Sequence, residues 1–102
     1  MLESGSFAVG WGDAGNMLGL NIEVLPGTYH KAVDPALLEA RLRADTKGEI
    51  KAVLVVQVDT ASSVMNDISA LRRAIDNVGH GALFMVDTIA SLGTMDYRMD
   101  DW

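Results

Sequence analysis

The chain has 102 residues, which is enough for one compact domain and too few for two. Hydrophobic residues make up 49% and charged residues 22%, a composition typical of globular rather than disordered proteins. The net charge of −6, with eight Lys and Arg scattered among fourteen acids, argues against nucleic-acid binding, and the absence of cysteine excludes disulfides and thiolate metal sites.

The first half of the chain predicts one strand and one helix. Residues 22–25 form a short apolar run that predicts a buried strand. Asp34-Pro35 predicts the start of a helix, with aspartate as the N-cap and proline at the first helical position. Leu38 and Leu42 then mark an apolar stripe at helical spacing, and Glu39 with Arg43 forms an exposed pair four residues apart.

The second half predicts two strands separated by a helix. Residues 52–56 and 82–86 are uninterrupted apolar runs, which indicates strands covered on both faces, as in parallel sheets flanked by helices. Between them, Asn66 or Asp67 can cap a helix that ends at Gly79. Its apolar face is formed at helical spacing by Ile68, Leu71, Ile75 and Val78.

The order strand, helix, strand, helix, strand predicts an α/β fold with a mostly parallel sheet and flanking helices. We expect one domain over residues 1–102. Complete α/β sheets usually have more strands than the three predicted here. We therefore interpret both ends of the chain as cuts and the chain as part of a larger domain.

The chain shows no targeting signal, and its most apolar stretch is far shorter than the ~20 residues that span a bilayer. We therefore expect a cytoplasmic protein with no membrane partner. The only histidines, His30 and His80, lie fifty residues apart in turn-like settings. We expect both to be surface residues rather than metal ligands.

Polar residues follow the predicted strands where α/β proteins bind ligands, outside the carboxyl ends of the strands. Residues 57–63 follow the central strand, and Asp87-Thr88 follows the last strand. The hydroxyl-rich cluster alone is equally consistent with ordinary turns. Asp87 is more informative, because a carboxylate at the end of a buried strand is unfavourable unless something pairs with it.

Residues 10–15 match the dinucleotide fingerprint G-x-G-x-x-G. The fingerprint requires a helix that opens at the second glycine and crosses back over the sheet. The next predicted strand begins by about Asn21 or Ile22, which leaves only about two helical turns. The match is therefore interpreted as accidental.

Three segments together resemble class V aminotransferases, the alanine–glyoxylate and serine–glyoxylate group. Residues 86–93, V-D-T-I-A-S-L-G, closely resemble the aspartate segment of that family. Residues 59–64 resemble the hydroxyl-rich segment that precedes it. Gly5-Ser6-Phe7 resembles the family's G-x-[FWY] turn, which a helix follows, so the likeness runs over essentially the whole chain.

The resemblance implies part of the large domain of a fold-type I enzyme that uses pyridoxal 5'-phosphate. Asp87 would face the pyridine nitrogen of the cofactor and keep it protonated. Ile89 would pack under one face of the ring and Phe7 on the other, and Thr60 would offer its hydroxyl. For Phe7, ordinary core packing is the alternative.

Two residues depart from the family pattern. Ser63 stands where the family commonly has glycine, so a positive φ there would be strained, and Gln57 replaces a frequent histidine. By the same resemblance, the lysine that binds the cofactor as a Schiff base lies downstream of this chain, and the phosphate-binding loop lies upstream. Lys31, Lys47 and Lys51 are placed in a turn, in a loop and at the start of a strand, where none can replace it.

The implied activity of the parent enzyme is transfer of an amino group between a small amino acid and a 2-oxo acid such as glyoxylate or pyruvate. We expect this chain alone to bind the cofactor poorly and to be inactive. The alternative is a non-catalytic α/β binding or assembly module from a truncated gene. In both cases we expect a homo-oligomer, because a cut sheet leaves unpaired strand edges.

Overall fold

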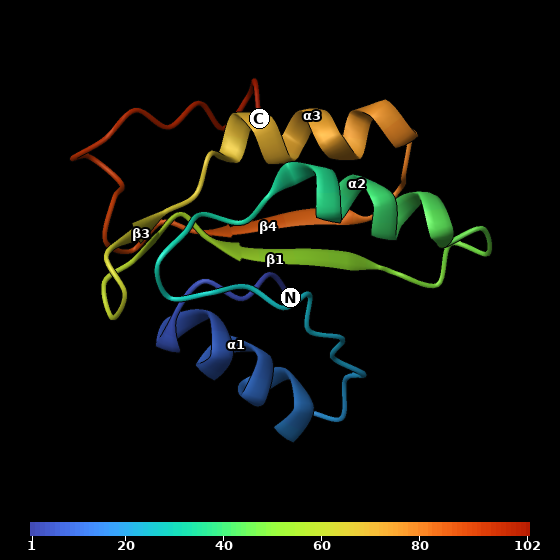
Figure 1. Ribbon diagram of the computed structural model, residues 1–102, viewed down its shortest axis with the longest axis horizontal. Coiled ribbons are helices and arrows are strands. Elements are labelled where there is room, and N and C mark those ends of the chain that lie inside the picture. Colours follow the sequence, from blue (N-terminus) through green and yellow to red (C-terminus); the bar gives the residue numbers. More distant parts are fainter.

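The computed structural model describes all 102 residues as three helices arranged around a small parallel sheet (Figure 1). The elements are α1 (Ser6–Met17), α2 (Pro35–Ala44), β1 (Ala52–Val56), β2 (Val58–Asp59), β3 (Val64–Met65), α3 (Ile68–Val78) and β4 (Leu83–Asp87). β1 pairs in parallel with β4, and β2 pairs with β3 as a short antiparallel hairpin. Helices α2 and α3 lie together on one side of the strands, and α1 lies on the other (Figure 1). The predicted α/β class with a parallel sheet and flanking helices is confirmed.

Helices α2 and α3 begin where local signals predict, and α3 also ends at the predicted residue. The Asp34 carboxylate accepts the Ala36 N–H at the start of α2, and the Asp67 carboxylate accepts the Ala70 N–H at the start of α3. Gly79 ends α3 in the left-handed conformation with φ of 66°. These caps satisfy backbone groups that a helix end leaves without partners.

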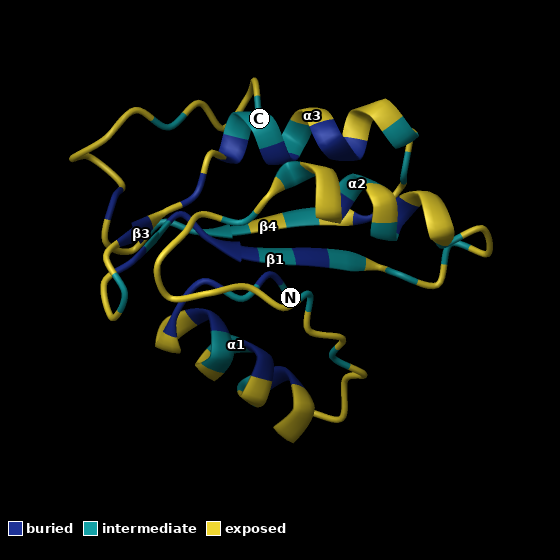
Figure 2. Cartoon of the chain, in the orientation of Figure 1, coloured by how far each residue is buried: buried dark blue, intermediate teal, exposed yellow.

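The core lies between β1 and the pair of helices α2 and α3. It consists of ten buried residues, namely Leu2, Leu38, Leu42, Val53, Val55, Ile68, Leu71, Ala74, Ile75 and Ala82. In Figure 2 the buried residues of α2 and α3 face each other and the strands, while the outer surfaces of these helices are exposed. Burial of each large aliphatic side chain contributes roughly 1.5–3 kcal/mol. Most of the stability therefore resides in this layer.

The predicted buried strand over residues 22–25 is wrong. The segment forms a single bridge, between Leu25 and Leu2, and Val24 is 47% exposed. Its backbone neighbours are only residues 1–3, which in turn bond to β1 through the Leu2 N–H and the Leu54 carbonyl. A short apolar run forms a strand only when a neighbouring segment pairs with several of its residues in a hydrogen-bonded ladder. Residues 1–3 form only one bridge with this run.

The prediction that both apolar strands are covered on both faces is wrong for β4. Leu83 and Met85 are 63% and 38% exposed, whereas the alternate residues Phe84 and Val86 are partly buried against the core. The physical reason is that one face of β4 packs against the core to which α2 and α3 contribute, while α1 contacts β1 and β2 instead of β4. One face of β4 is therefore open.

The glycines of residues 10–15 lie inside α1, not in a turn between a strand and a helix. Gly12 and Gly15 are buried, and a Cβ on Gly15 would come within 2.8 Å of the Ile22 side chain. These glycines allow α1 to pack closely against the segment that follows it. In a dinucleotide-binding loop the helix would open at the second glycine, Gly12, whereas α1 already begins at Ser6.

No helix in the structure combines the length and the apolar character that crossing a membrane requires.

Candidate functional site

The site predicted from the sequence falls at the carboxyl end of the sheet. Val56, the last residue of β1, lies opposite Asp87, the last residue of β4. The Gln57 N–H donates to the Asp87 carbonyl over 2.9 Å, so the two strands leave the sheet side by side. The structure therefore brings the loop after β1, with Thr60, to the same edge as Asp87.

Asp87 lies on the face of the sheet away from α2 and α3. The side chains of successive strand residues alternate between faces, and Val86 is the neighbour that packs toward the core. The Asp87 residue is half-buried, and its Oδ1 accepts the Ile89 N–H at 2.9 Å. The sequence predicts that this carboxylate lies at the end of a fully buried strand. In the structure the face of β4 that Asp87 shares with Met85 is open instead.

The other three predicted site residues are exposed. Phe7, in the first turn of α1, is 54% exposed, and Ile89, in the turn after β4, is 88% exposed. Thr60 lies on the exposed turn between β2 and β3. Phe7 is not packed in the core of this chain, because its ring lies at the surface.

Asp59 is fully buried at this edge, and its role was not predicted from the sequence. Its Oδ2 accepts the Ala8 N–H at 3.0 Å and its Oδ1 accepts the Ala61 N–H at 3.2 Å. An ideal Cβ on Gly5 would lie 2.3 Å from the Asp59 Cγ, so only glycine fits there. The signal that could have found Asp59 is the one used for Asp87, an acid shortly after a buried strand.

Three further buried polar residues fasten the loops at this edge. The Ser91 hydroxyl donates to the Gln57 side-chain oxygen at 2.6 Å, which ties the turn after β4 to the end of β1. The Asn66 side chain accepts the Val33 N–H and donates to the Val56 carbonyl, each at 2.8 Å. Gln57 therefore has a structural partner here, and Asn66 joins the segment before α2 to the last residue of β1.

The opposite end of the sheet holds a buried His80–Asp45 pair. The His80 Nδ1 accepts the Ala82 N–H, so Nε2 carries the proton and donates to Asp45 over 3.1 Å. The prediction of a surface position is wrong for His80, whose side chain is 8% exposed, whereas His30 is exposed as expected. The fold buries His80 because its ring satisfies both the Asp45 carboxylate and the backbone before β4.

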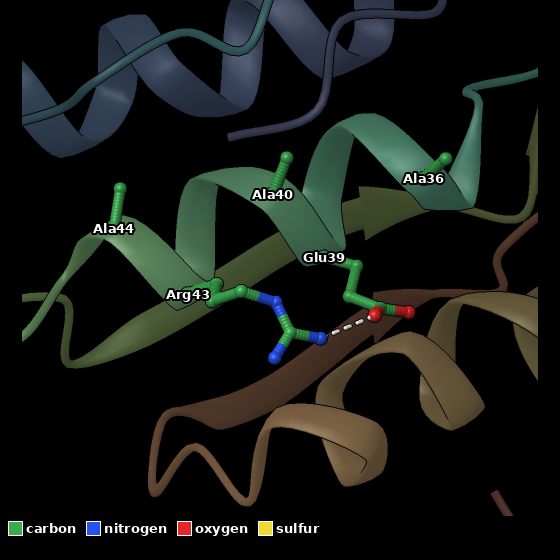
Figure 3. A pocket seen from close by; sticks show the side chains of 5 residues that line it. All are labelled: Ala36, Glu39, Ala40, Arg43 and Ala44. Carbon is green, nitrogen blue, oxygen red and sulfur yellow. Dashed lines mark hydrogen bonds and ion pairs between the residues drawn. The ribbon is translucent and has the colours of Figure 1, made fainter.

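Two surface hollows of about 500 and 540 Å³ lie away from the predicted site. The first runs along α2, where Figure 3 shows three alanines, Ala36, Ala40 and Ala44, beside the Glu39–Arg43 ion pair. The second surrounds the His80–Asp45 pair at the amino ends of β1 and β4. Neither is lined by Asp87, Thr60, Phe7 or Ile89.

The residues at the carboxyl edge fit part of a pyridoxal-phosphate site. A carboxylate suits a protonated ring nitrogen, a hydroxyl suits a polar ring substituent, and two exposed apolar side chains suit the ring faces. The lysine that an aldehyde would need is not supplied by the carboxyl ends of β1 and β4. Lys51 precedes β1 and bonds the Gly48 carbonyl, Lys47 lies in the preceding turn, and Lys31 lies in a turn that bridges to Thr28.

Comparison with known proteins supports the resemblance along the whole chain. Residues 1–102 match the family model described as aminotransferase class-V. The chain is 41% identical to the serine–glyoxylate aminotransferase of Methylorubrum extorquens over 96% of its length, and 38% identical to the L-aspartate–glyoxylate aminotransferase of Paracoccus denitrificans over 97%. It is 36% identical to the serine–glyoxylate aminotransferase of Arabidopsis thaliana over 96%. The chain spans about a quarter of the length of each, 24%, 25% and 24%.

Proposed function

Because the chain belongs to the class-V aminotransferase family, we propose that it forms part of the cofactor-binding domain of a pyridoxal-phosphate enzyme. The enzyme would transfer an amino group between a small amino acid and a 2-oxo acid such as glyoxylate or pyruvate. The observation that carries this proposal is the position of Asp87 directly at the carboxyl end of β4, beside the loop that holds Thr60.

Four residues of this chain would bind the cofactor. The Asp87 carboxylate would hold a proton on the pyridine nitrogen, and the Thr60 hydroxyl would orient the ring by a hydrogen bond. Phe7 and Ile89, both exposed in this chain, would cover the two faces of the ring and exclude water from it. When bound, pyridoxal phosphate supplies an electron sink for the electron pair released as the substrate loses its α-proton.

The chain by itself would not complete this site. Lys47 and Lys51 precede β1 and lie at the opposite end of the sheet from Asp87, and Lys31 lies in the turn that bridges to Thr28. We therefore propose that the isolated chain binds the cofactor weakly and does not transaminate. The complete protein is proposed to be a cytoplasmic homo-oligomer.

A second candidate function is a non-catalytic assembly module. It is favoured by the open face of β4, where Leu83 and Met85 are exposed although they lie in the sheet. Apolar strand residues without cover favour association. Reading the flanking DNA separates the two candidates, because an in-frame Gly-rich loop upstream and an S-x-K-like segment downstream belong to the enzyme alone.

The proposal is tested on the full-length product of the gene that encodes this chain. We expect purified protein to carry pyridoxal phosphate, visible by its absorbance, and to transfer the amino group of serine, alanine or aspartate to glyoxylate. Asp87→Ala should lower turnover by at least 100-fold, since the charge that holds the ring proton is lost. Asp100→Ala, an exposed acid near the C-terminus, is the matched control and should leave turnover unchanged. A full-length protein without bound cofactor would refute the proposal.

A further inference from the structure

Asp59 is a buried carboxylate whose partners are backbone N–H groups. Its exposed fraction is 0%, and no ion pair in the structure includes it. Each oxygen accepts one N–H, from Ala8 on one side and from Ala61 on the other. Because burial of an unpaired carboxylate is strongly unfavourable, these two bonds are what allow the residue to be there.

The Ala8 contact makes Asp59 the cap of α1 from fifty-one residues away. Helix α1 has Gly5 at its N-cap position and no side-chain cap of its own. A negative charge at this end is favoured by the helix dipole. A Cβ on Gly5 would overlap the Asp59 carboxylate, so the absence of a side chain at Gly5 is the condition for the distant cap.

The same carboxylate lies next to both parts of the proposed ring site. Phe7 adjoins Ala8 on α1, and Thr60 lies between Asp59 and Ala61 on the hairpin turn. A second tether runs beside it, from the Ser62 hydroxyl to the Ser4 carbonyl at 2.7 Å. Asp59 therefore links, through one buried group, the residue proposed to stack on the cofactor ring and the residue proposed to bond it.

We propose that Asp59 is a positioning residue that fixes Phe7 and Thr60 relative to each other for the cofactor ring, a role that rests on the proposed function. It touches no ligand itself. Its two oxygens hold two backbone segments in one register, so that the aromatic ring and the hydroxyl reach the same small planar molecule. A cap that served only the stability of α1 would need the Ala8 contact but not the contact with Ala61.

Asp59→Asn is the variant that separates these roles. The asparagine amide has one acceptor oxygen, so its NH2 group would oppose one of the two backbone N–H groups. The matched control is Asp67→Asn at the start of α3, an exposed cap that uses one oxygen, where asparagine caps almost equally well. Ser62→Ala, which removes the second tether, is the milder variant if Asp59→Asn does not fold.

The first measurement is amide hydrogen exchange on the full-length protein. In Asp59→Asn we expect exchange at Ala8 and Ala61 to accelerate at least tenfold, with exchange at Leu71 in α3 unchanged. Asp67→Asn should leave Ala8 and Ala61 as in the wild type. Unchanged exchange at both amides in Asp59→Asn would overturn the proposal, because the carboxylate would then hold neither segment.

The second measurement uses the full-length protein with pyridoxal phosphate as the probe. Asp59→Asn should raise the dissociation constant of the cofactor about tenfold and reduce the circular dichroism of the bound ring, which reports its fixed orientation. If exchange at Ala8 and Ala61 accelerates but the dissociation constant and the circular dichroism of the bound ring equal those of the wild type, the positioning role alone is overturned. A wild-type protein that binds no pyridoxal phosphate would instead refute the proposed function and the positioning role with it.

Discussion

Ser63 has the left-handed backbone conformation that favours glycine, with φ of 60°, and it is the only residue other than glycine with a positive φ. It closes the turn between β2 and β3, three residues after Thr60. An L-residue in this conformation is strained by roughly 1–2 kcal/mol. Ser63→Gly removes the strain but gives the unfolded chain more freedom, which costs roughly 0.5–1 kcal/mol. The expected result is a net stabilisation of about 0.5–1 kcal/mol, or a rise in Tm of about 2–8 °C.

The assay is urea denaturation followed by far-UV circular dichroism, with the midpoint compared at constant slope. Ser69→Gly is the matched control, because Ser69 lies inside α3 with a helical backbone. There the same substitution should destabilise by about 0.5–1 kcal/mol. A loss of stability in Ser63→Gly equal to that of the control would refute the reasoning, since it would mean that the turn relieves the strain of a positive φ.

Three further predictions concern acid, activity and association. The N–H groups of Ile50 and Glu49 lower the pKa of Asp45 from 3.8 to about 2. The stabilisation by the Asp45 carboxylate is therefore present above pH 3.8 and is lost as the pH falls toward 2. In Asp45→Asn the urea midpoint should depend less on pH over that range than it does in the wild type. The isolated chain with added pyridoxal phosphate should show no alanine-dependent consumption of glyoxylate, and turnover that Asp87→Ala abolishes would contradict this. Sedimentation across a dilution series should show a dimer, larger species or aggregates, whereas one monomeric species with a sharp melt would contradict the association expected from the open face of β4.

Helices α2 and α3 could be predicted because their signals are local. Asp34-Pro35 and Asp67 each satisfy N–H groups two or three residues away, and Gly79 ends its helix by its own φ. Strand formation depends instead on a partner elsewhere in the chain. Residues 22–25 have the composition of a strand but find only one bridge, and residues 83–87 form a strand whose second face lacks the cover that their composition predicts.

The position of the candidate site could be predicted for a similar reason. Parallel order alone brings the carboxyl ends of β1 and β4 together, so the loops with Thr60 and Asp87 meet at one edge. The bonds that fix these loops could not be predicted. They join residues 51, 34 and 33 positions apart, between Asp59 and Ala8, Ser91 and Gln57, and Asn66 and Val33, and nothing in the local sequence pairs them.

The polar and apolar residues at this edge are divided in a way that favours a binding surface over an incomplete core. The polar side chains that cross-link the loops are buried and bonded internally, with exposed fractions of 0% for Asp59, 4% for Gln57 and 0% for Ser91. The side chains proposed to meet the cofactor, Phe7 and Ile89, are instead exposed. In an edge whose neighbours were merely missing, the buried polar groups would need partners beyond this chain. Here Asp59, Gln57 and Ser91 have partners within the chain, whereas the buried Ser4 hydroxyl has none. The three satisfied side chains give the loops a defined shape, and the apolar groups beside them are exposed.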